Sequence, residues 1–181
     1  MTELVVGPAR RADAAAIAAV YAPAVQHTPA SFELAPPDER EISSRMVSGL
    51  PWFVARRGSA VVGYAYAGPH RARPAYRWAV DCSVYLSATE QGRGTSRLLY
   101  VQLLDELRRL GYVQAFAGIT LPNPPSVGLH EAMGFCPVGV HRRVGFKLGR
   151  WHDVGWWQLS LVEPAPVTPT KPVRWELASD G

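Results

Sequence analysis

The residues whose spacing points most directly to chemistry form a short glycine loop, Gln91-Gly92-Arg93-Gly94-Thr95-Ser96. It lies between a β-rich segment and a strongly periodic helical segment. At a helix N-terminus the unpaired backbone N–H groups point at one spot, and the helix dipole adds positive potential there. Glycines let the backbone come close to bound phosphate oxygens. The pattern therefore favours a pyrophosphate as the ligand.

Three other interpretations of this loop are possible. A Walker loop requires a Lys next to Ser or Thr after the last glycine, and none stands there. A Rossmann fingerprint requires glycine at the place of Arg97, together with an early first strand. Both fit poorly, so the alternative for the loop taken alone is an ordinary turn whose glycines serve backbone geometry.

Helices are indicated by apolar spacing and by their end signals. Asp13 is a candidate cap for a first helix, whose face contains Ile17, Val20, Tyr21 and Ala24. Pro36-Pro37 opens a second helix that stops before Gly49. The helix after the glycine loop is predicted to end at Gly111, with an apolar stripe at Leu99, Leu103, Leu107 and Leu110. A short helix follows Pro124-Pro125-Ser126.

Strand patterns fill the remaining segments. A hairpin is predicted around Arg57-Gly58-Ser59, and Ala75 to Leu86 forms a further strand beside it, antiparallel to its neighbour. More strands are expected at 113–121, Val138 to Phe146 and Val154 to Leu161. Strands alternating with helices after an initial hairpin predict an α/β fold with a mixed sheet covered on both faces.

The bulk composition excludes several classes of function. The chain has 181 residues, 48% of them hydrophobic, and its net charge of +4 is not clustered, which argues against nucleic acid as a partner. Cys82 and Cys136 form no CxxC or Cys/His pattern, so neither a disulfide framework nor a metal site is expected. The sequence contains no apolar run of about 18 residues, so no membrane span is predicted. We expect a cytoplasmic protein without membrane contact.

Several motifs in one order resemble the GNAT superfamily of acetyltransferases, and within it the phosphinothricin acetyltransferase branch, which also includes methionine sulfoximine and methionine sulfone acetyltransferases. They are the glycine loop, YAYAGPHRARPAY (64–76), DCSVYLS (81–87), LPNPPSVGLHEAMGF (121–135) and VGFKLGRWHDVGWWQLSL (144–161). The resemblance covers Leu4 to Leu161. It implies the GNAT fold, with a mixed, mostly antiparallel sheet flanked by helices on both faces. We expect a GNAT domain at 1–162 and a proline-rich extended tail at 163–181, either disordered or lying across a neighbouring subunit.

The resemblance implies acetyl-CoA as cosubstrate. Its pantetheine arm would pair with the strand at Val84, Tyr85 and Leu86, and its pyrophosphate would bind the N–H groups from Gly92 to Arg97. Ser96 departs from the Gly or Ala usual at its position. The whole implied cofactor set consists of Val84, Tyr85, Leu86, Gln91, Gly92, Arg93, Gly94, Thr95, Ser96, Arg97, Asn123 and Ser126.

The positions that match the family's catalytic residues are Asp81 and His130. Acetyl transfer to an amine needs a base for the ammonium proton and donors for the thioester oxygen. Close relatives carry Glu at the first position, one methylene longer than Asp81. Either Asp81, directly or through a water, or His130 is therefore the main base.

The implied acceptor site holds a small amino acid with an acidic or strongly polar side chain. Arg71 and Arg73 would grip its anionic group, since guanidinium binds carboxylate or phosphinate in a bidentate way. Tyr76, Ser83, Phe32 and Glu33 are further substrate candidates.

The resulting prediction is a homodimer that acetylates the α-amino group of phosphinothricin, methionine sulfoximine or a related amino acid by direct attack. In the dimer, the stretch Phe146 to Asp153 would reach the partner's site. The alternatives are the same fold acting on a protein N-terminus or a polyamine, and a non-catalytic acyl-CoA-binding module.

Overall fold

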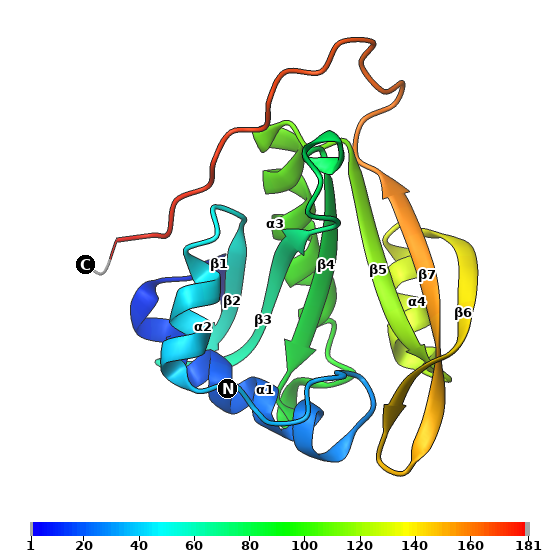
Figure 1. Ribbon diagram of the computed structural model, residues 1–181. Helices are drawn as coiled ribbons and strands as arrows, with labels where there is room; N and C mark the ends of the chain where they lie inside the picture. Colours follow the sequence, from blue (N-terminus) through cyan, green and yellow to red (C-terminus); the bar gives the residue numbers. More distant parts are fainter. Residues whose placement is uncertain (1, 180–181) are drawn as a thin grey trace.

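A seven-stranded sheet in the order β1-β2-β3-β4-β5-β7-β6 organises the chain (Figure 1). The computed structural model describes residues 2–179. All neighbouring strands run antiparallel except β4 and β5, which confirms the mixed, mostly antiparallel α/β sheet. The strands are β1 Leu4–Pro8, β2 Trp52–Arg57, β3 Ala60–Pro69, β4 Ala79–Leu86, β5 Gln114–Leu121, β6 Cys136–Lys147 and β7 Arg150–Ser160; the helices are α1 Ala14–His27, α2 Glu39–Met46, α3 Thr95–Leu110 and α4 Pro124–Ala132.

Helices cover both faces of the sheet, as predicted. Successive side chains of a strand point to opposite faces, and two neighbours on β3 show which helices lie where. The ring of Tyr64 contacts Tyr21 of α1, with centroids 6.4 Å apart. A Cβ at Gly63 would instead lie 3.5 Å from Leu99 of α3. The helix α4 is on the α3 side, because Tyr100 of α3 hydrogen-bonds His130.

Glycines in the left-handed conformation bound α3 at both ends. Gly94 is its N-cap with φ of 80°, and Gly111 is its C-cap with φ of 90°. The predicted apolar stripe is buried, since its four leucines are at most 2% exposed. The sequence pattern of this helix is therefore confirmed.

Three local features differ from what the sequence suggested. Asp13 occupies the N-cap position of α1, but its carboxylate makes no capping bond and instead accepts bonds from Arg56 at 2.6 Å and from the Arg10 N–H at 2.7 Å. β4 begins at Ala79 rather than Ala75, because Pro74–Tyr76 forms a 3₁₀ turn. β1 was not predicted, since its five residues lack a flanking hairpin signal.

The sheet is forked at its centre. β4 and β5 pair only through Ala79↔Gln114, Val80↔Ala115 and Asp81↔Phe116. Beyond this point β4 continues to pair with β3, while β5 pairs with β7 along its whole length. Figure 1 shows β4 and β5 diverging towards the lower edge of the view. The fork leaves one edge of β4, from Cys82 to Leu86, without a strand partner on the β5 side.

The C-terminal tail contacts the body of its own chain. The Thr170 carbonyl accepts a 2.7 Å bond from the Trp78 indole, and the Trp175 N–H donates to the Gly49 carbonyl at 3.0 Å. The Trp175 side chain is 7% exposed and belongs to the hydrophobic core. The predicted tail residues 180–181, and residue 1 of the predicted domain, lie outside the described residues.

Candidate active site

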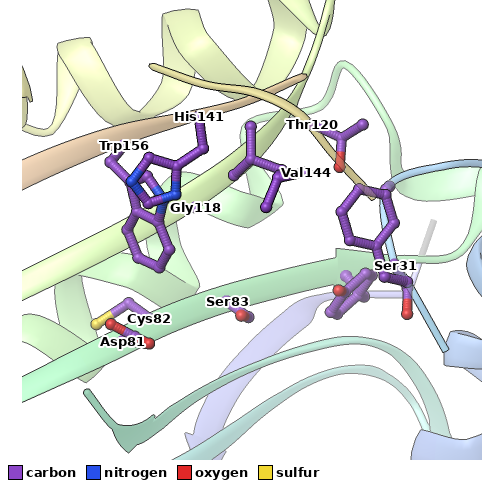
Figure 2. A pocket seen from close by; sticks show the side chains of 13 residues that line it. Ser31, Asp81, Cys82, Ser83, Gly118, Thr120, His141, Val144 and Trp156 are labelled. Atoms are coloured by element: carbon purple, nitrogen blue, oxygen red, sulfur yellow. The ribbon is translucent and has the colours of Figure 1, made fainter. Parts of the chain in front are cut away.

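A cavity of about 380 Å³ opens at the fork of the sheet. Figure 2 shows Asp81 and Ser83 of β4 on one side and Gly118, Thr120 and Trp156 on the other. The strands β4, β5, β6 and β7 and the loop after α1 all contribute residues to its lining. The lining residues are Ala30, Ser31, Phe32, Asp81, Cys82, Ser83, Tyr85, Gly118, Thr120, His141, Val144, Val154 and Trp156.

Asp81 stands at the base of the fork and lines this cavity. Its side chain is 33% exposed. Burial raises the pKa of the Asp81 carboxyl above its usual value, while the hydrogen bond from His70 and the charge of Arg71 act against that rise. A carboxylate with a raised pKa beside a cavity is suited to accept a proton near neutral pH.

His70 is a site residue that sequence reasoning missed. Its Nδ1 lies 2.6 Å from Oδ1 of Asp81. The ring is stacked on Phe116 at 4.2 Å between centroids and meets Trp156 edge-on at 6.0 Å. His70 also lines a second cavity of about 210 Å³, which shares His141 and Trp156 with the first.

His130 is not brought to the cavity with Asp81. Its side chain is 4% exposed, and the described residues that line the cavity do not include it. Nδ1 lies 2.7 Å from the Ser126 carbonyl, so it carries the proton and donates, while Nε2 accepts from the Tyr100 hydroxyl at 2.9 Å. Burial lowers the pKa of His130 below its usual value. The imidazole thus links α4 to α3 with both nitrogens engaged.

The glycine loop has the backbone geometry that its sequence suggests. Gly92 and Gly94 have φ of 73° and 80°, and a Cβ on either would meet nothing within 4 Å. Glu90, 2% exposed, anchors the loop by accepting bonds from Arg57 at 2.6 Å and from the Thr95 hydroxyl at 2.8 Å. These anchors fix the loop at the start of α3.

The N–H groups of this loop differ in their availability. The Arg97 N–H donates to the Gly94 carbonyl at 3.1 Å, so it is already engaged. The N–H groups of Thr95 and Ser96 belong to the first turn of α3, so they have no acceptor carbonyl within the helix. Gln91, Gly92, Arg93 and Gly94 are exposed beside them.

The other predicted cofactor residues lie on β4 and at the start of α4. Val84, Tyr85 and Leu86 belong to the part of β4 beyond its last pair with β5, and Tyr85 lines the cavity. Asn123 is the N-cap of α4, where its side-chain oxygen accepts from the Ser126 N–H at 3.3 Å.

The predicted arginines lie on the loop after β3. Arg71 lines the second cavity, with its guanidinium 5.8 Å from the centre of the Trp156 ring. Arg73 precedes the turn that contains Tyr76, and both are exposed. The Tyr76 ring lies 6.1 Å from that of His70. The substrate candidates Ser83 and Phe32 line the first cavity. Arg71, Arg73 and Tyr76 do not belong to its lining.

The loop after α1 closes one side of the cavity against β6. The Lys147 ammonium, on a residue 6% exposed, donates to the Ser31 carbonyl at 2.5 Å. A Cβ at Gly145 would come within 2.3 Å of the Phe32 ring, so only glycine leaves room for this contact. Glu33 points elsewhere: it binds Arg45 through two bonds, at 2.7 and 3.1 Å, which lower the pKa of its carboxyl.

Thr120, His141 and Trp156 were also missed as lining residues. They come from β5, β6 and β7, and only strand pairing brings them opposite Asp81. Within residues 2–179, no cluster of three or more His, Cys, Asp or Glu side chains suits a metal ion. None of the helices in the described part of the chain is long and apolar enough to cross a membrane.

Comparison with known proteins agrees with this architecture. Residues 8–156 match the acetyltransferase (GNAT) domain family. The phosphinothricin N-acetyltransferase of Streptomyces viridochromogenes is 40% identical over 169 residues, covering 92% of both chains. The L-methionine sulfoximine/L-methionine sulfone acetyltransferase of Salmonella typhimurium is 37% identical, covering 87% of this chain and 94% of its own.

A solved structure extends the similarity to the backbone. The phosphinothricin acetyltransferase of Sinorhizobium meliloti, in complex with AcCoA, superposes with a TM-score of 0.89 at 37% identity, and 96% of each chain is covered. The forked sheet, the loop before α3 and the matched residues together show that this chain belongs to the GNAT family of acetyltransferases.

Proposed function

We propose that this chain is an acetyl-CoA-dependent N-acetyltransferase that acetylates the α-amino group of a small amino-acid-like substrate such as phosphinothricin or methionine sulfoximine. The observation that carries the proposal is the place of Asp81, a carboxylate at the base of the fork and on the wall of the cavity. Relatives with these activities, and a similar structure that contains AcCoA, support the choice of substrates.

Asp81 is the base of the reaction. The substrate ammonium gives one proton to the Asp81 carboxylate, and the amine nitrogen then attacks the thioester carbonyl carbon. The carbon–sulfur bond breaks, the nitrogen loses its second proton, and the thiolate leaves and takes up a proton. The amine attacks the thioester directly in a ternary complex, so no acyl-enzyme is part of this mechanism. The position of Asp81 beside a cavity suits direct contact with the ammonium or contact through one water.

The cosubstrate lies between the fork and the glycine loop. Its pantetheine arm pairs with the free edge of β4 at Val84, Tyr85 and Leu86, and its pyrophosphate binds the first N–H groups of α3. This division is supported by the absence of a β5 partner along that edge and by the exposed loop Gln91 to Gly94. A backbone N–H on the same edge stabilises the thioester oxygen.

The acceptor occupies the cavity between β4 and β7. Ser83 and Phe32 contact it, while Arg71, with Arg73 and Tyr76 beside it, binds its anionic end. Arg71 stands over Trp156, which lines both cavities and so connects the arginine with the site of Asp81. Glu33 acts through its pair with Arg45, which fixes the loop that presents Phe32.

The test is thiol release from acetyl-CoA with a panel of acceptors: phosphinothricin, methionine sulfoximine, methionine sulfone, common amino acids, polyamines and N-terminal peptides. We expect activity with the first three. Asp81→Asn should lower kcat by about a hundredfold or more, with acetyl-CoA binding retained. Asp105→Asn, at a 67% exposed aspartate of α3, is the matched control and should leave kcat unchanged.

Other outcomes of this panel would overturn the proposal. Activity confined to polyamines or peptides would show that the acceptor is not a small amino acid. Acetyl-CoA binding without turnover on any amine would make the chain a non-catalytic acyl-CoA-binding module.

The enzyme acts as a homodimer that uses the β6–β7 ribbon. Nearly all of β6 is exposed, and large apolar side chains that are 49% to 60% exposed gather on this ribbon: Val138, Val140, Val144, Phe146, Leu148 and Trp151. Such a patch is typical of a protein interface. Light scattering should give a dimer, and Trp151→Glu should give a monomer. A wild-type monomer at micromolar concentration would contradict this.

We also assign the enzyme to the cytoplasm, the compartment in which thiols stay reduced. Both cysteines are unpaired, and Cys82 is buried. Cell fractionation with detection of the chain in the membrane or the culture medium would contradict this assignment.

A further inference from the structure

We propose that His70 is the positioning residue of the Asp81 base: it fixes the orientation of the carboxylate and supplies the hydrogen bond that keeps it available to the substrate. The inference builds on the proposed function, in which Asp81 takes the ammonium proton. It assigns a role to a side chain outside the first cavity, 12% exposed, which meets Asp81 from the side of the second cavity.

The contact between the two side chains has the geometry of a charge-assisted hydrogen bond. Nδ1 of His70 is 2.6 Å from Oδ1 of Asp81, slightly shorter than a usual charge-assisted bond between a nitrogen donor and a carboxylate. With a proton on Nδ1, the imidazole donates this bond and the carboxylate accepts it. One carboxylate oxygen is thereby occupied, which leaves Oδ2 as the proton acceptor.

The His70 ring is held in place from several sides. It is stacked on Phe116 with an interplanar angle of 15° and lies edge-on to Trp156 at 83°. Its backbone N–H lies 3.4 Å from the Ala79 carbonyl, so the residue is attached to β4 two positions before Asp81. A donor fixed by packing holds its acceptor more precisely than a mobile side chain does.

Asp81 needs such a partner because a raised pKa makes it a better proton acceptor only while the carboxyl stays ionised at the working pH. Burial raises the pKa of the carboxyl and so favours the protonated form, which cannot accept a proton. The hydrogen bond from His70 favours the charged form and is the largest influence in that direction. The remaining titratable or charged groups near this pair are Arg71 and Tyr76 on the loop after β3, Tyr66 on β3, Cys82 on β4 and His141 on β6.

The test compares two variants of the full-length enzyme. His70→Phe keeps an aromatic ring for the stack on Phe116 but removes the donor, and His70→Asn replaces the donor with an amide N–H. His27→Phe, at an exposed histidine that ends α1, is the control for loss of a histidine elsewhere. Circular dichroism and acetyl-CoA binding establish that each variant is folded. If His70→Phe does not fold, His70→Leu is used in its place.

The expected result is a change in pH dependence as well as in rate. His70→Phe should lower kcat by about tenfold or more and move the acidic limb of the kcat/KM profile upward by about one pH unit. His70→Asn should recover much of both, and His27→Phe should change neither. A fall in kcat with an unchanged acidic limb would overturn the proposal, because loss of packing alone lowers the rate without changing the titration of Asp81.

A second readout separates this inference from the proposed function. Titration of the Asp81 carboxyl by ¹³C NMR, assigned with Asp81→Asn, requires no turnover. The Asp81 resonance should titrate at higher pH in His70→Phe than in the wild type, and an unchanged titration would overturn the role of His70. Failure of the wild type to acetylate any acceptor would refute the function and leave this measurement valid.

Discussion

Asp81 of β4 and Phe116 of β5 face each other as the last residue pair before the two strands separate. The carboxylate therefore stands where the sheet ceases to be continuous, and the ring of His70 contacts both residues: it is hydrogen-bonded to Asp81 and stacked on Phe116. Strand separation creates the space for substrates, and the last pair fixes the base at the edge of that space.

The pH dependence of activity follows from the surroundings of Asp81. Burial raises the pKa of its carboxyl, and only the ionised form accepts a proton, so activity should fall as pH decreases through this raised value. The acidic limb of kcat/KM should thus lie above the pH range in which exposed aspartates titrate. Initial rates measured across a series of buffers check this. A limb at or below the range of exposed aspartates would contradict the assignment.

His130 should contribute to stability rather than to acetyl transfer. His130→Phe keeps a ring but leaves the Tyr100 hydroxyl, on a fully buried residue, without this partner. The free energy of unfolding should decrease by about 1–3 kcal/mol, while kcat stays near the wild-type value. Urea denaturation and initial rates measure the two effects.

A variant of Tyr100 tests whether the loss of stability comes from its hydrogen bond with His130. Tyr100→Phe should destabilise to a similar degree, and the double variant should lose less than the sum of the two, since the residues share one bond. A loss of kcat by a hundredfold in a stably folded His130→Phe would instead make His130 the main base.

The glycine loop should tolerate no side chain at Gly94. This residue caps α3 with φ of 80°, a conformation that costs other L-residues about 1–2 kcal/mol. Gly94→Ala should therefore weaken acetyl-CoA binding by about tenfold, measured by isothermal titration calorimetry. Gly7→Ala on β1, where a Cβ meets nothing within 4 Å, is the control. Unchanged affinity in Gly94→Ala would remove the loop from the cofactor site.

The tail should be required for stability through Trp175. This side chain is 7% exposed, with its ring 6.4 Å from that of Phe53. Trp175→Ala should lower the free energy of unfolding by about 3–5 kcal/mol, as measured by denaturant titration. Val167→Ala, at a fully exposed tail residue, should have no effect. Equal stability of the two variants would show that the tail is not part of the folding unit.

The elements predicted well from sequence were those with long local patterns. The leucine stripe of α3, with Gly111 at its end, specifies a helix by spacing alone. β1 was missed because its five residues have no flanking hairpin signal, and its partner β2 lies far along the chain. The role of Asp13 was missed because its partner Arg56 is 43 positions away.

The site was predictable only in part for a similar reason. Asp81 was found through a motif, but its partner His70 is positioned by rings from β5 and β7 that no local pattern connects with it. His130 was a natural candidate for catalysis from its residue type. Its engagement with Tyr100 and Ser126 depends on how α3 and α4 pack.

The three-residue seam between β4 and β5 has a further consequence for the molecule as a whole. A sheet joined along so short a line lacks, at its centre, the ladder bonds that a complete strand pair would provide. A substrate that pairs with the free edge of β4 would act as an additional strand, and its binding energy would add to the free energy of folding. The gap that admits the substrate is the weakest line of the sheet. The melting temperature and the protection of backbone amides from exchange should therefore increase as the site is occupied by substrate.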